Sequence, residues 1–132
     1  MITLLADHNV EGQAHLLFGA LQSLGWADLL DLHLATFADI GLTAAATDRE
    51  VWLRAQADGM LLLTDNRNKS GQDSLEQTLL NEPSDMLLPV LTVGRAQRLL
   101  IDHAYREACA ERIAEIVLDL ETYRGIPRLY IP

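Results

Sequence analysis

Apolar residues fall into short runs and helical stripes that alternate along the chain. Residues 2–6 and 60–64 are short runs that are almost wholly apolar, and such runs are typical of strands buried on both faces. Between them, apolar residues of 11–24 recur at three- and four-residue steps, which predicts an amphipathic helix. Gly25 follows and supplies a helix stop.

The rest of the chain continues this alternation. Residues 29–35 fit a strand but also fit a helix. Thr47 and Glu50 stand three residues apart as in a capping box, which predicts a helix over 48–58 that Gly59 ends. The further predicted elements are a helix over 73–81, a strand over 89–94, a long helix over 95–123 and a short last strand over 128–131.

Strands that alternate with helices predict an α/β fold. We expect a three-layer α/β/α sandwich with a small, mainly parallel sheet and helices on both faces. The chain has 132 residues, of which 49% are hydrophobic, and this size suffices for one core without disulfides. With no internal repeat or linker, residues 1–132 are expected to form a single domain, with the helix over 95–123 as its C-terminal element.

The net charge and the cysteine content limit the partners and the cellular location that we expect for this protein. The net charge of −9 disfavours broad contact with nucleic acid, although a small acidic metal site remains compatible with it. The lone Cys109 lies in a helical pattern and is expected to be a buried apolar residue. A single cysteine, the absence of a basic leader and the absence of a long apolar run favour a cytoplasmic protein without a membrane partner.

Candidate chemistry gathers where the predicted strands end. Asp7 follows the strand over 2–6, Asp65 follows the strand over 60–64, and Asp48 begins the helix that leads into the second strand. Sites in open parallel sheets form beyond the carboxyl ends of the strands, so we expect these three carboxylates at one edge. Hard cations such as Mg²⁺ or Mn²⁺ prefer oxygen ligands and would offset the repulsion among them. Such an ion can polarise a phosphate and activate water.

Other chemistries lack their motifs, and the charged residues also have structural interpretations. The chain has no Gly-x-Ser-x-Gly elbow, no glycine-rich phosphate loop and no Cys/His zinc cluster. Asp7, Asp48 and Asp73 can act as helix caps or first-turn charges, and Asp65 and Asn66 can be turn formers. Arg67 and Lys69 can contact a phosphate or can lie in a solvated loop.

Three segments resemble the PIN-like domain family, the fold of many small metal-dependent ribonucleases. They are Leu4 to Asn9, Thr47 to Val51 and Met60 to Arg67, and the resemblance spans roughly residues 2 to 95. It implies that Asp7 and Asp48 are the first two catalytic acids. The family pattern places its third carboxylate, in a Thr-x-Asp element, at the position of Asn66.

The amide at this position changes what the resemblance implies for catalysis. Asn66 can offer a metal an oxygen but no charge, which weakens Mg²⁺ affinity. Asp65 or Asp73 would have to supply the third carboxylate, and Asp65 would need a local rearrangement because adjacent residues after a strand point in different directions.

Two functions therefore remain open at this stage. The first is a Mg²⁺- or Mn²⁺-dependent ribonuclease that uses Asp7, Asp48 and Asp65 or Asp73, with Arg67 or Lys69 on the phosphate of RNA. The second is a catalytically degenerate module of the same fold that acts through a protein partner. A homodimer through the apolar stripe of the helix over 95–123 is one form of the second function.

Overall fold

The computed structural model describes residues 1–66, 75, 78 and 86–132. Its five strands form one sheet in the order β2-β1-β3-β4-β5, and every neighbouring pair is parallel. The strands are β1 (Ile2–Ala6), β2 (Leu32–Ala35), β3 (Leu61–Thr64), β4 (Val90–Val93) and β5 (Arg128–Ile131). The parallel sheet confirms the α/β prediction.

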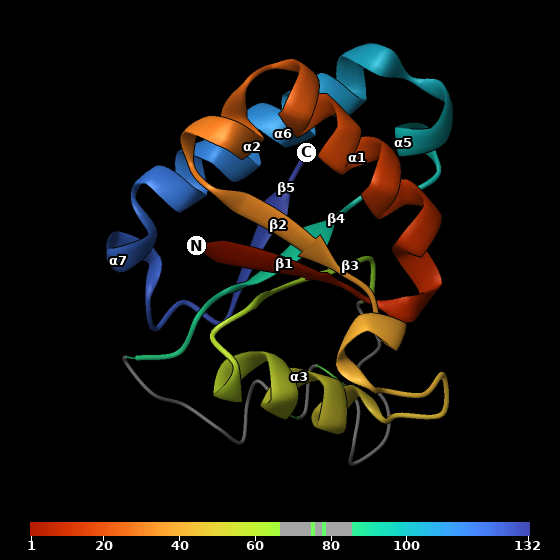
Figure 1. Cartoon of the computed structure of the whole chain (residues 1–132), viewed down its shortest axis with the longest axis vertical. Coiled ribbons are helices and arrows are strands. Elements are labelled where there is room, and N and C mark those ends of the chain that lie inside the picture. The colour runs from red at the N-terminus through yellow and green to blue at the C-terminus, as the bar shows by residue number, and fades with distance from the viewer. Residues whose placement is uncertain (67–74, 76–77, 79–85) are drawn as a thin grey trace.

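Helices cover both faces of the sheet, as Figure 1 shows. Among the described elements, α3 and the 3₁₀ turn at Ala38–Ile40 lie on one face, and the helices α1, α2, α5, α6 and α7 pack over the opposite face. The helices are α1 (Glu11–Ser23), α2 (Trp26–Leu29), α3 (Asp48–Ala57), α5 (Arg98–Ile101), α6 (His103–Leu118) and α7 (Leu120–Tyr123), with 3₁₀ turns at His8–Val10 and Ala38–Ile40. Within the described residues, no helix combines the length and apolar character needed to cross a membrane.

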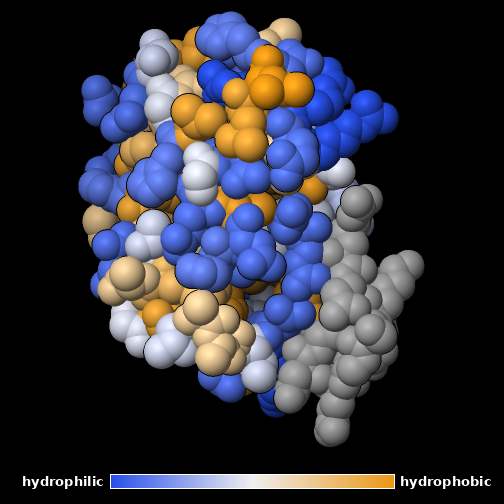
Figure 2. All heavy atoms as spheres, turned by 90° about the vertical axis from the view of Figure 1, so that its right-hand side faces the viewer, coloured by the Kyte–Doolittle hydropathy of each residue, from blue (hydrophilic) through white to orange (hydrophobic). Residues whose placement is uncertain are grey.

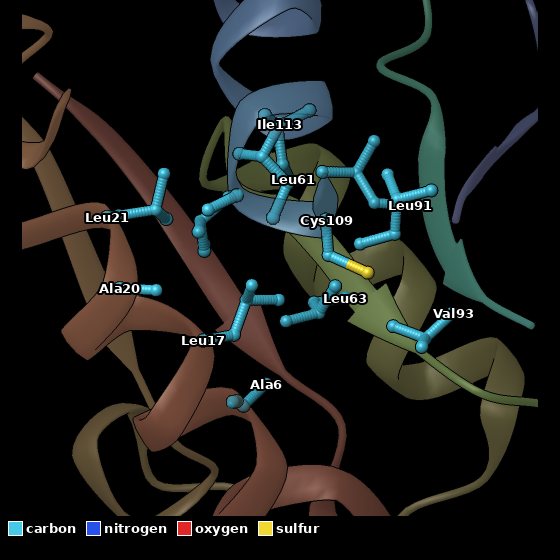
Figure 3. Packing of buried hydrophobic residues seen from close by; sticks show 14 of the residues in the cluster. Ala6, Leu17, Ala20, Leu21, Leu61, Leu63, Leu91, Val93, Cys109 and Ile113 are labelled. Carbon is cyan, nitrogen blue, oxygen red and sulfur yellow. The ribbon is translucent and has the colours of Figure 1, made fainter. Parts of the chain in front are cut away.

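The core divides into two clusters, one on each face of the sheet. Successive strand residues point to opposite faces, so Leu61 and Leu63 join the cluster under α1 and α6 while Leu62 joins the cluster against α3. Figure 3 shows Leu63 packed close to Cys109 of α6 in the first cluster. Both faces of the central strand are thus apolar, which explains its continuous hydrophobic run.

Residues that the sequence indicates as helix ends lie at or next to the observed ends of α1 and α3. The Thr47 hydroxyl oxygen accepts a hydrogen bond from the Glu50 N–H at 3.1 Å and caps α3, as the capping box predicted. Gly25, shortly after α1, has a φ of 87°, a left-handed conformation that glycine adopts without steric cost.

Two predicted elements differ from the structure. The helix predicted over 95–123 is interrupted at Asp102 and Asp119 into α5, α6 and α7. Asp102 is extended, with φ −116° and ψ 102°, and its carboxylate accepts the N–H of Tyr105 at the start of α6. An aspartate that bonds the backbone in this way competes with a continuous helix. The second strand begins at Leu32, because α2 takes up residues as far as Leu29.

The apolar stripe on the last long helix is not available to a dimer partner. Ile113, Ile116 and Val117 are buried in the core of their own chain. The short last strand predicted over 128–131 is present as β5, which pairs with β4 at one edge of the sheet. The helix predicted over 73–81 falls almost entirely outside the described residues.

Candidate functional site

The sheet order places a site between β1 and β3. The connection from β1 leads to β2 on one side, and β3 then lies on the other side. Crevices at such a reversal, outside the carboxyl ends of the strands, are where open α/β sheets bind ligands. These ends point toward the right of Figure 1, and Figure 2 shows that this face is mostly hydrophilic in the described part of the chain.

Strand register brings Asp7 beside Thr64. Leu5 pairs with Leu62 and Ala6 with Leu63, so the next residues, Asp7 and Thr64, are neighbours. The Asp7 N–H donates to the Leu63 carbonyl oxygen at 2.9 Å and extends the pairing by one residue. The fully buried Thr64 hydroxyl then donates to the Asp7 carboxylate at 2.7 Å. A capping role for the Asp7 side chain is wrong, since the turn after β1 has no side-chain cap.

Hydrogen bonds continue from this pair to the third predicted residue. The Thr64 oxygen accepts the Asn66 N–H at 2.9 Å. The Asn66 side-chain amide donates to the Asp48 carboxylate at 2.8 Å. Asp7, Thr64, Asn66 and Asp48 thus form one hydrogen-bonded chain, which joins two strand ends to the start of α3.

Asp48 does more than favour the first turn of its helix. The carboxylate oxygen that accepts the Asn66 amide also accepts the Leu75 N–H at 3.0 Å. Because this carboxylate accepts N–H groups of both Asn66 and Leu75, it holds these two residues against the start of α3. The sequence interpretation of Asp48 as a first-turn charge therefore accounts for only part of its role.

The electrostatics at Asp7 favour a positive partner. Burial raises the pKa of the Asp7 carboxyl above its ordinary value, and the negative charges of Asp48 and Asp65 raise it further. The hydrogen bonds from Thr64 and from the His8 backbone act in the opposite direction without cancelling the rise. A carboxylate in this position is stabilised by a proton or by a cation.

Of the other residues considered in the sequence analysis, some lie near Asp7 and others lie outside the described residues. Asp65 is half-buried and near enough to act on Asp7 through its charge. The His8 ring packs against Phe37 with 5.7 Å between ring centroids, and its Nδ1 lies 3.5 Å from a Glu11 carboxylate oxygen. Asp73, Arg67 and Lys69, which were predicted as a metal ligand and two phosphate contacts, lie outside the described residues.

Sequence reasoning missed a neighbouring arginine. Arg128, in the edge strand β5, donates to the Asn66 carbonyl oxygen at 2.8 Å and to the buried Thr92 hydroxyl oxygen at 2.6 Å. It thereby ties the segment after β3 to the two last strands. No local signal marks this residue, because it is 62 positions from Asn66 and only the strand order brings them together.

In the described part of the chain, no three His, Cys, Asp or Glu side chains are grouped closely enough to hold a metal ion among themselves. The site there consists of two carboxylates bridged by a threonine and an asparagine, with a third carboxylate nearby. No model of a protein family, no curated protein and no solved structure matches this chain. The resemblance to PIN-like domains therefore stays a prediction that rests on the residues themselves.

Proposed function

We propose that this protein is a Mg²⁺- or Mn²⁺-dependent ribonuclease with a PIN-like active site at Asp7 and Asp48. The observation that carries the proposal is the hydrogen-bonded chain from Asp7 through Thr64 and Asn66 to Asp48. It holds two carboxylates from distant segments at the carboxyl ends of β1 and β3, where one of them has a raised pKa. Groups with such shifted titration in a cleft are frequent at functional sites.

The donor set fits a hard divalent cation. Asp7 and Asp48 offer carboxylate oxygens, and Mg²⁺ in enzymes is often bound by one or two carboxylates, with water and substrate phosphate completing its shell. When bound, such a cation neutralises charge on a phosphate and lowers the pKa of water at the reacting centre. The absence of a closer group of three acids in the described residues is compatible with this mode of binding.

The protein's own groups would position these ligands. The Thr64 hydroxyl holds one oxygen of Asp7, and the Asn66 amide holds one oxygen of Asp48. An ionised carboxylate has about four acceptor positions on its two oxygens, so hydrogen bonding at some of them is compatible with binding a cation at another. Because the chain carries a net charge of −9, a bound cation would also make this edge locally attractive to a phosphodiester.

The test is cleavage of single-stranded RNA by the purified protein with Mn²⁺. We expect cleavage by the wild type and its loss in Asp7→Asn and Asp48→Asn. Asp28→Asn is the matched control, because this exposed carboxylate of α2 precedes the amino end of β2, at the opposite edge of the parallel sheet from Asp7. Equal cleavage by all four proteins would indicate a contaminating nuclease and would refute the proposal.

One observation favours a second function, a catalytically degenerate module that binds a protein partner. The Asn66 amide donates to Asp48 at 2.8 Å, so a neutral donor already satisfies an oxygen that a metal would otherwise stabilise. If the protein is such a degenerate module, calorimetry on the wild type should detect no Mn²⁺ binding that depends on Asp7 and Asp48. Asn66→Asp, which supplies a third carboxylate, would then create such binding. Tight, Asp7-dependent binding by the wild type would exclude the degenerate version.

A further inference from the structure

The outer edge of β2 is open among the described elements. β2 is a terminal strand of the sheet, and in Figure 1 no described helix or loop passes in front of it. The Ile2 N–H donates to the Asp31 carbonyl oxygen at 3.1 Å, which fixes the alternation of hydrogen bonds between β1 and β2. Odd-numbered residues of β2 therefore bond to β1, whereas the N–H and C=O groups of Leu32 and Leu34 point away from it.

These outward N–H groups have no hydrogen-bond partner within the described residues. The next outward N–H, that of Thr36, is occupied because it donates to the Asp39 carboxylate at 2.8 Å. Leu32 is buried and Leu34 is half-buried, and backbone groups that are withdrawn from water without a partner cost free energy. An added strand would supply the missing hydrogen bonds.

A pocket of about 540 Å³ lies beside this edge, between β2, α1 and α2. Its apolar residues Phe18, Leu32 and Leu34 lie next to polar residues that include His15 and Gln22, and no described lysine or arginine lines it. When a protein binds an extended segment as an added strand, backbone groups supply hydrogen bonds and alternate side chains of the segment enter pockets of this kind. A long side chain with an apolar stem and a polar end fits walls of this mixed character.

The charge around this edge favours a basic partner. Residues 1–48 contain six Asp and Glu side chains and no Lys or Arg side chain, so all ten Lys and Arg residues lie later in the chain. Asp31 precedes β2 and Asp39 follows it, and both are exposed. The Met1 amine lies 3.5 Å from the Asp31 carboxylate. It adds one positive charge against these two carboxylates, so the edge remains negative when the histidines are neutral.

We propose that β2 binds an extended, lysine- or arginine-rich segment of a partner protein as an added strand, with a basic side chain in the pocket beside α1. Opposite charges on the edge and the segment bring the two together and disfavour acidic segments. A second copy that paired through its own β2 would bring two negative edges together, so like charges disfavour that occupant. The proposal goes beyond the proposed nuclease function and does not depend on catalysis at Asp7.

The test is binding of short synthetic peptides to the isotope-labelled protein, followed by chemical shifts and hydrogen exchange of the Leu32 and Leu34 amides. Three peptides with blocked ends are compared. The first alternates lysine and valine, the second alternates glutamate and valine, and the third is the lysine peptide with methylated nitrogens along one backbone edge. The methylated peptide keeps the charge but cannot donate hydrogen bonds along that edge. We expect the first peptide to shift both amides at lower concentration than the other two, and to slow their exchange.

A pair of variants separates the charge of the edge from the net charge of the protein. Asp39→Asn keeps an oxygen that can accept the Thr36 N–H, and the loss of one exposed charge should weaken binding of the lysine peptide about twofold to fivefold. Glu111→Gln makes the same charge change on an exposed residue of α6 and should leave binding unchanged.

Four results would overturn the proposal. They are an absence of change in the two amides with the lysine peptide, equal affinity for the lysine and glutamate peptides, equal affinity for the methylated and unmethylated peptides, and equal losses in the two variants. A wild-type protein that is dimeric by light scattering, with both amides already protected from exchange, would assign the edge to a second copy and would also overturn it.

Discussion

Thr64→Val tests whether hydrogen bonding by one buried hydroxyl supports the candidate site. Valine has nearly the same shape as threonine but neither donates nor accepts. The substitution removes the donor to the Asp7 carboxylate and the acceptor of the Asn66 N–H. Losing the bond to a charged group costs about 2 kcal/mol, and losing the neutral bond costs about 1 kcal/mol. Burying a methyl group in place of the hydroxyl returns about 1 kcal/mol. We therefore expect a net loss of about 2 kcal/mol in the free energy of unfolding.

Thr64→Ser supplies the matched control. Serine keeps the hydroxyl and both hydrogen bonds and removes one methyl group from a fully buried position, at a cost of about 1 kcal/mol. The expected order of stability is therefore wild type, then serine, then valine. If apolar burial alone decided stability at this position, valine would be the most stable of the three.

The assay is urea denaturation at neutral pH followed by far-ultraviolet circular dichroism. The denaturation midpoint should fall while its slope stays constant, which indicates a change in stability rather than in the extent of unfolding. A Thr64→Val protein at least as stable as Thr64→Ser would show that the hydrogen bonds around Thr64 do not hold the site together.

The remaining predictions concern three other positions. The pKa of the Cys109 thiol is raised to about 11 by burial, so iodoacetamide should alkylate it slowly in the native protein and rapidly in guanidinium, and equal rates would contradict the burial seen in Figure 3. The raised pKa of Asp7 means that its contribution to stability is lost as pH rises through the folded pKa. Asp7→Asn should therefore gain stability over the wild type between acidic and neutral pH, and denaturation curves with a constant difference would refute this. Thr47→Ala should lower the free energy of unfolding by about 1 kcal/mol through loss of the α3 cap, whereas the exposed Thr43→Ala should not.

The sequence predicted helices and strands correctly where the hydrophobic pattern of the segment itself determines its structure. The apolar run at residues 60–64 became β3, and the stripe over 11–24 became α1. It failed at Asp102, where an aspartate that could have been an exposed helix residue became the cap of α6. An aspartate can either lie within a helix or cap one. In this structure Asp102 caps α6, and α5 and α6 both pack on α1.

The same distinction applies to the candidate site at Asp7 and Asp48. The residue types and their order along the chain determined that Asp7 and Asp48 would follow or precede buried strands, because hydrophobic periodicity fixes where strands begin and end. Only the tertiary structure decided that Thr64 and Asn66 link these carboxylates. It also brought Arg128 of β5 to Asn66. Their contact depends on strand order, which is not encoded in the spacing of neighbouring residues.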